Sequence, residues 1–168
     1  MKLKFLKYRT NLMLKKNQAV RGSVPFKNAK TVGIIFTVED KQKHFAVKDF
    51  IKRFEADGKH IQVLEYLPDN KENYEFKFDF FMDKDVSFWG NINSPNAIQF
   101  ADGPFDFLFY LDLTPNPLIL HLLARSKAKC RVGRMFDDGH SYLDLMVDSV
   151  SNTQALLDTM YKYVTQLR

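Results

Sequence analysis

Short apolar runs that alternate with helical patterns constrain the fold of this chain more than any other feature. The first run, Val32 to Phe36, is continuous enough to predict a strand buried on both faces of a sheet. Residues 41–57 then carry apolar side chains at helical spacing, and residues 60–67 form a second strand-like run rich in Ile, Val and Tyr. A strand, a helix and a strand in this order predict a right-handed crossover and a parallel sheet.

The second half of the chain continues the alternation. Further strands are predicted at residues 107–111, 130–135 and 142–147. Asn116 followed by Pro117 predicts the start of one helix, and Ser151 with Gln154 predicts a capping box for the last one. We therefore expect a single α/β domain of the Rossmann or flavodoxin type, with about five mostly parallel strands and helices on both faces.

Residues 76–104 interrupt this rhythm. Phe76, Phe78 and Phe80 alternate with polar residues, which is typical of a strand with one solvated face. Residues 86–89 are predicted to return as a second strand, so an inserted β-hairpin is expected, followed by a long loop over residues 90–104. Three aromatic residues of this region are candidates for an exposed partner surface, namely Phe81, Phe88 and Trp89.

Charge is distributed unevenly along the 168 residues. The net charge is +5, yet residues 1–30 hold nine basic residues and no acidic one, and the other 138 hold 16 basic and 20 acidic residues. The chain therefore divides into a basic helical arm with its linker, residues 1–30, and an acidic Rossmann-like domain, residues 31–168. The candidate contact residues of the arm are Lys2, Lys4, Lys7, Arg9, Lys15, Lys16 and Arg21.

The arm has three alternative roles. Residues 3–17 can form a helix with two apolar stripes, one of which contains Leu3, Leu6 and Met13. These three side chains are buried if the helix folds back on its own acidic domain. Alternatively, the uncompensated charge binds a nucleic acid, or it binds an anionic membrane surface, another protein or a second copy of the chain.

Candidate catalytic residues follow the predicted strands, because ligands of open α/β sheets bind beyond the carboxyl ends of the strands. Thr37, Glu39 and Asp40 follow the first strand, although a turn with two acids and no glycine disfavours a phosphate there. The weak catalytic candidates are Asp112, Asn116, Arg134, Asp138 and His140. The segment from Asp137 to His140 is better explained as a polar turn, and Asp112 with Asn116 is better explained as a capping arrangement.

Several functional classes lack their sequence signals. The chain has no P-loop and no nucleophile elbow, so no cofactor is expected. Its single cysteine, Cys130, excludes an intramolecular disulfide and a multi-cysteine zinc site, and no metal is expected. No apolar stretch reaches the length of a transmembrane helix, and lysines interrupt any secretory signal, so a cytoplasmic location is expected.

The basic arm, the strand at residues 31–37, Asp106-Phe107-Leu108 and the stretch from Leu122 to Gly133 together resemble a family of small uncharacterised proteins from Bacteroidota, known as a domain of unknown function. The resemblance covers most of the chain and implies a Rossmann-like fold without an assigned activity. The stretch ending in Arg131-Val132-Gly133 is also distantly similar to the acceptor half-domain of heptosyltransferase-type glycosyltransferases. No catalytic residue is carried over from that likeness.

The leading hypothesis is a non-enzymatic α/β binding or adaptor protein, whose basic N-terminal helix docks on its own domain or on a partner. One alternative is a nucleotide-binding or glycosyltransferase-like enzyme with its site at the carboxyl ends of the strands. Another is a factor associated with RNA or the ribosome.

Overall fold

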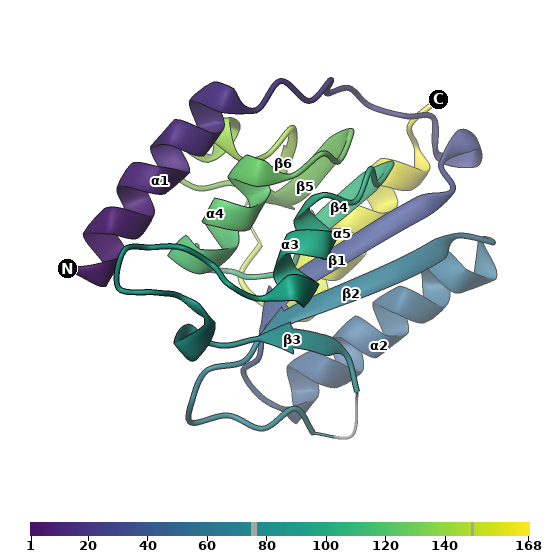
Figure 1. The fold of residues 1–168 in the computed structure, drawn as a ribbon. Coiled ribbons are helices and arrows are strands. Elements are labelled where there is room, and N and C mark those ends of the chain that lie inside the picture. Colours follow the sequence, from purple (N-terminus) through teal and green to yellow (C-terminus); the bar gives the residue numbers. More distant parts are fainter. Residues whose placement is uncertain (75–76, 149) are drawn as a thin grey trace.

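The computed structural model describes residues 1–74, 77–148 and 150–168, and within them six parallel strands form one open sheet (Figure 1). The strands are β1 (Thr31–Thr37), β2 (His60–Tyr66), β3 (Asp79–Phe81), β4 (Phe107–Tyr110), β5 (Cys130–Arg134) and β6 (Leu145–Val147). Their spatial order is β3-β2-β1-β4-β5-β6. This is the order of dinucleotide-binding doubly wound sheets rather than the flavodoxin order, and it puts the topological switch point between β1 and β4.

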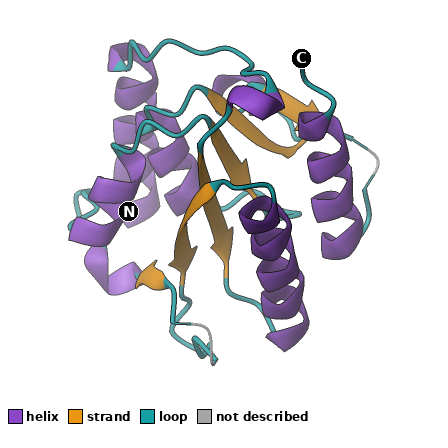
Figure 2. Ribbon diagram, turned by 90° about the vertical axis from the view of Figure 1, so that its right-hand side faces the viewer, coloured by secondary structure: helices purple, strands orange, loops and turns teal. Residues whose placement is uncertain are grey.

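Helices cover both faces of the sheet (Figure 2). In the described residues they are α1 (Lys2–Lys16), α2 (Lys41–Ala56), α3 (Pro95–Ala101), α4 (Pro117–Arg125) and α5 (Thr153–Thr165). Val32, Ile34 and Phe36 of β1 pack in the apolar cluster under α2 and α5, while Ile35 packs in the cluster under α3 and α4. The prediction of an α/β domain with a parallel sheet is confirmed, with six strands in place of about five.

The predicted β-hairpin is wrong. Phe80 and Phe81 belong to β3, which pairs in parallel with β2, and Val86 forms an antiparallel bridge with Ile92 instead of pairing with β3. Between them Asp83–Asp85 form a 3-10 turn in which the Asp85 carboxylate accepts a hydrogen bond from the Met82 N–H at 2.8 Å. This turn leads the chain away from β3, which is therefore an edge strand with β2 as its neighbour in the sheet. Phe76 lies outside the described residues.

Two helix starts also differ from the prediction. The stretch 90–104 contains α3, because Ser94 caps Ala97 N–H at 3.2 Å and Pro95 supplies the first helical residue. The last helix begins one residue later than predicted, since the capping side chain is Asn152, which accepts from Ala155 N–H at 2.8 Å. The Asn116 cap of α4 is as predicted and accepts from Leu118 N–H at 3.0 Å.

Helix α1 packs on α4, outside the layer that covers the sheet (Figure 1). Its buried residues are Leu6 and Thr10; Met13 is half-buried, whereas Leu3 is 62% exposed. The α1 backbone also lies directly against Gly90, where an added Cβ would come within 2.5 Å of the Leu6 nitrogen. The linker then crosses to the opposite face, held where Gly22 N–H bonds the Lys129 carbonyl at 2.9 Å.

Gly90 provides a test of how firmly α1 is docked. Gly90 and Gly58 both have a φ of +79°, but an added Cβ has open space only at Gly58. Both Gly→Ala variants suffer backbone strain of about 1–2 kcal/mol, and Gly90→Ala adds a collision with the α1 backbone. We expect Gly90→Ala to lower the free energy of unfolding by about 1–3 kcal/mol more than Gly58→Ala does, measured by urea denaturation. Equal losses would show that α1 does not dock against Gly90.

Candidate functional site

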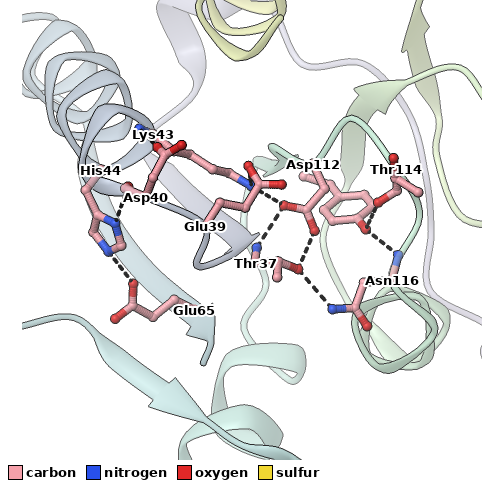
Figure 3. Close-up of polar contacts among 10 residues, drawn as sticks. Thr37, Glu39, Asp40, Lys43, His44, Glu65, Asp112, Thr114 and Asn116 are labelled. Atoms are coloured by element: carbon pink, nitrogen blue, oxygen red, sulfur yellow. Dashed lines mark hydrogen bonds and ion pairs between the residues drawn. The ribbon is translucent and has the colours of Figure 1, made fainter. Parts of the chain in front are cut away.

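A buried ion pair lies at the switch point, beyond the carboxyl ends of β1 and β4 (Figure 3). The Lys43 ammonium lies 2.7 Å from Asp112 Oδ1, and both residues are at most 5% exposed. A second carboxylate, that of half-exposed Glu39, lies 3.2 Å from the same ammonium. Because desolvating two charges is costly, such a pair is stable only when further hydrogen bonds satisfy it.

Those further hydrogen bonds join β1, β4 and α4. Asp112 accepts from Thr37 twice, from its N–H at 2.8 Å and from its hydroxyl at 2.6 Å. The Thr37 hydroxyl in turn accepts from Asn116 Nδ2 at 2.9 Å, and Asn116 N–H donates to the Tyr110 hydroxyl at 2.8 Å. Burial, followed by the nearby Asp112 charge, raises the pKa of Tyr110. The phenol therefore stays neutral. The hydrogen bonds around Asp112 connect the carboxyl ends of β1 and β4 with the start of α4.

The amino terminus of α2 is occupied by the chain's own carboxylate. Asp40 Oδ1 accepts a hydrogen bond from Lys43 N–H at 2.8 Å, at the place where doubly wound enzymes bind the phosphate of a ligand. Beside it, a cavity of about 470 Å³ opens between the first turns of α2 and α5. Its lining includes Glu39, Asp40, Lys43 and Asn152. Two of these side chains are acidic, so the local charge disfavours an anionic ligand.

The structure brings some of the predicted catalytic residues together and separates others. Asp112 and Asn116 share the network above, and Arg134 lies beside it, donating to the carbonyls of Leu113 at 3.3 Å and Val150 at 3.1 Å. Asp138 and His140 are exposed on the turn after β5, where Asp138 adopts a left-handed conformation. In the described residues, no three His, Cys, Asp or Glu side chains are placed to hold a metal ion.

Lys43 is the residue of this site that the sequence analysis missed. The sequence did contain an indication of an ion pair at Lys43. A lysine in the first turn of a helix faces the positive end of the helix dipole and needs a carboxylate nearby. Glu39, four residues earlier, and Asp112 supply it.

A second buried pair joins α2 to β2 and was also missed. His44 Nε2 lies 3.0 Å from Glu65 Oε2, and both side chains are fully buried (Figure 3). Burial raises the pKa of Glu65, which the hydrogen bond from His44 partly opposes. Elsewhere in the core, burial raises the pKa of Cys130 to about 12, so this thiol has the character of a packed core residue.

The seven candidate contact residues of the arm divide into two groups. Three of them bond to the domain: Lys2 lies 3.0 Å from Asp83 Oδ2, Arg9 donates to the Trp89 carbonyl at 2.7 Å, and Arg21 donates to the Ala128 carbonyl. The other four are exposed lysines, which together we call the α1 lysines: Lys4, Lys7, Lys15 and Lys16. Within the described residues, none of their ammonium groups has a hydrogen bond or an ion pair.

An aromatic groove adjoins the α1 lysines. The Phe5 ring of α1 lies 4.9 Å from the Trp89 ring and 5.8 Å from the Phe88 ring, between centroids. Tyr8 and Trp89, which are 63% and 58% exposed, line a mainly apolar groove of about 620 Å³ together with Lys4 and Arg9. Phe88 is 53% exposed, so two of the three predicted aromatic candidates face solvent, whereas Phe81 is fully buried.

A buried polar contact fixes α1 to α4 underneath this surface. The Thr10 hydroxyl lies 2.9 Å from His121 Nδ1, and it also donates to the Leu6 carbonyl at 2.8 Å. His121 is 7% exposed. Burial, together with the charges of Arg125 and Arg9, lowers the pKa of His121 to about 4.

Comparison with known proteins places almost the whole chain in one family. Residues 2–167 match a family model whose description is "Family of unknown function (DUF6913)". The chain belongs to this family. A search of the curated proteins found no match, and a search of the solved structures found none either.

The buried ion pair leads to a first prediction at this site. Lys43→Met leaves the Asp112 carboxylate buried without its cation, and we expect the free energy of unfolding to fall by about 3 kcal/mol. Lys41→Met, at an exposed position in the same turn, should change it by less than about 0.5 kcal/mol. Adding Asp112→Asn to Lys43→Met removes the uncompensated charge and should restore part of the loss. If the Lys43 and Lys41 variants were equally stable by urea denaturation, the pair would have no structural role.

His121 leads to a second prediction, on pH. Between about pH 4 and pH 6.5 the unfolded chain binds a proton at His121 that the folded chain does not, so stability falls as the pH is lowered through this window. His121→Gln removes that proton. We expect the loss of unfolding free energy between pH 7 and pH 5 to be about 2 kcal/mol larger in the unmodified chain than in His121→Gln. Parallel pH profiles of the two proteins would contradict the assignment.

Proposed function

We propose that this protein is a non-enzymatic binding module, and that it engages an anionic partner surface through the outer side of α1. The observation that carries the proposal is the set of α1 lysines, four exposed cations without an ion pair in the described structure, beside an open aromatic groove. Charge of this kind attracts anionic partners at long range and is weakened by salt.

The acidic residues on this side do not neutralise the α1 lysines. Asp83 pairs with Lys2 at 3.0 Å, Asp102 with Arg125 at 3.1 Å, and Asp106 with Lys129 at 3.1 Å. The positive surface also continues past the end of α1, where Lys16, Lys127 and Lys129 line a further hollow of about 780 Å³. Docking of α1 on its own domain therefore uses part of the arm's charge and leaves the rest facing outward.

The candidate catalytic residues support the enzyme alternative less well. Both Asp112 oxygens, the Asn116 amide and the Arg134 guanidinium already bond to groups of the chain itself. The Asp40 carboxylate also occupies the helix end where a nucleotide phosphate would bind. A nucleotide or nucleotide sugar that raised the Tm, with the rise abolished in Asp112→Ala, would nevertheless reverse this ranking.

Two variants of equal net charge test the proposal. The first replaces the four α1 lysines by Gln; the second replaces four exposed lysines on the side of α2 and α5 by Gln, namely Lys27, Lys41, Lys52 and Lys162. Both reduce the net charge from +5 to +1. At about 1 kcal/mol for each lysine near an anionic surface, we expect the first variant to bind immobilised heparin roughly 1000-fold more weakly and to elute at lower salt. The α1 lysines and the aromatic groove together are called the α1 surface below. Elution of both variants at the same salt concentration would show that the α1 surface is not the binding site.

A further inference from the structure

We infer that the partner of the α1 surface is an anionic lipid bilayer, with the α1 lysines at the headgroups and the aromatic groove at the lipid boundary. This inference rests on the proposed function and names the chemistry of its partner. Among the described residues, no helix combines the length and hydrophobicity needed to cross a bilayer, so the contact is peripheral. We place this contact at the cytoplasmic leaflet of the membrane, because that leaflet carries the anionic lipids.

The kind of side chain on this surface favours lipid over nucleic acid. All four exposed cations on α1 are lysines, whose long apolar stems lie along an interface while the ammonium stays among headgroups. The two arginines of the arm, Arg9 and Arg21, each donate one hydrogen bond to a carbonyl of the chain, which fixes part of the planar fork that a phosphate would need. Leu3, which is 62% exposed on the same helix, adds an aliphatic side chain of the kind that amphipathic helices bury at a lipid boundary.

The arrangement of the groove supports the same partner. Trp89 and Tyr8 place rings of mixed apolar and polar character next to Lys4, which is the combination found at membrane interfaces. Phe5 packs edge-on against Trp89 at 4.9 Å, and Gly90 brings the α1 backbone against the same loop. Helix and loop are therefore held together as one surface, rather than as a flexible tail that orders only on binding.

Trp89 is the only tryptophan of the chain, so its fluorescence reports on this surface alone. The full chain is titrated with phosphatidylcholine vesicles that contain about 30% phosphatidylserine, with pure phosphatidylcholine vesicles, and with poly(U) RNA. We expect a blue shift of the Trp89 emission, and quenching by brominated lipid tails, with the anionic vesicles only. High salt should reverse the binding.

A matched pair of variants separates lipid contact from charge alone. Tyr8→Ser removes an exposed ring from the groove, and Tyr163→Ser removes an exposed ring from α5 on the opposite face of the sheet (Figure 2). Tyr8→Ser should weaken vesicle binding about tenfold and should weaken heparin binding by much less. Tyr163→Ser should affect neither.

The outcomes distinguish the two proposals. Heparin binding that depends on the α1 lysines, without Trp89 quenching by lipid, would overturn the lipid inference and leave the proposed function in place. Binding of poly(U) that changes the Trp89 emission, with no vesicle binding, would identify a nucleic acid as the partner instead. Loss of neither heparin nor vesicle binding in the α1 lysine variant would overturn both proposals.

Discussion

Burial of β1 on both faces is the constraint on which the arrangement of this protein depends. Val32 to Phe36 are all buried, with alternate side chains directed into two separate apolar clusters. Each cluster has to be covered by helices, and α2 and α5 cover one while α3 and α4 cover the other (Figure 2). Helix α1 then packs on α4 rather than on the sheet, so it buries only a narrow stripe around Leu6 and Thr10 and leaves its outer side to solvent.

The same topology creates a switch point between β1 and β4, where folds of this kind usually hold a ligand. In this chain the polar groups at the switch point bond to one another. Lys43 and Asp112 form the central pair, and Asp40 caps the amino terminus of α2. A fold is shared by many functions, and function is decided by the site that it carries. The internal use of these polar groups is why we propose a function for the α1 surface rather than for the switch point.

Docking and partner binding are compatible roles for the basic arm. One side of α1 makes the Thr10–His121 contact and the close approach to Gly90, and these fix its orientation. The other side presents lysines that the acids of the domain do not reach. An arm that is already ordered loses less conformational entropy on binding than a disordered basic tail would.

The amino-acid sequence by itself determined the fold class and most element positions, because burial periodicity and capping are local properties. The continuous run of β1, the helical spacing of α2 and the Asn116-Pro117 start of α4 were all readable in this way. The sequence also pointed to Asp112 and Asn116 as neighbours at one edge. Only the tertiary structure decided that Lys43 reaches Asp112, 69 residues away, that His44 meets Glu65, and that Trp89 packs on Phe5. These contacts join residues that are far apart in the sequence. They depend on how separate elements pack in space, which no local sequence pattern encodes.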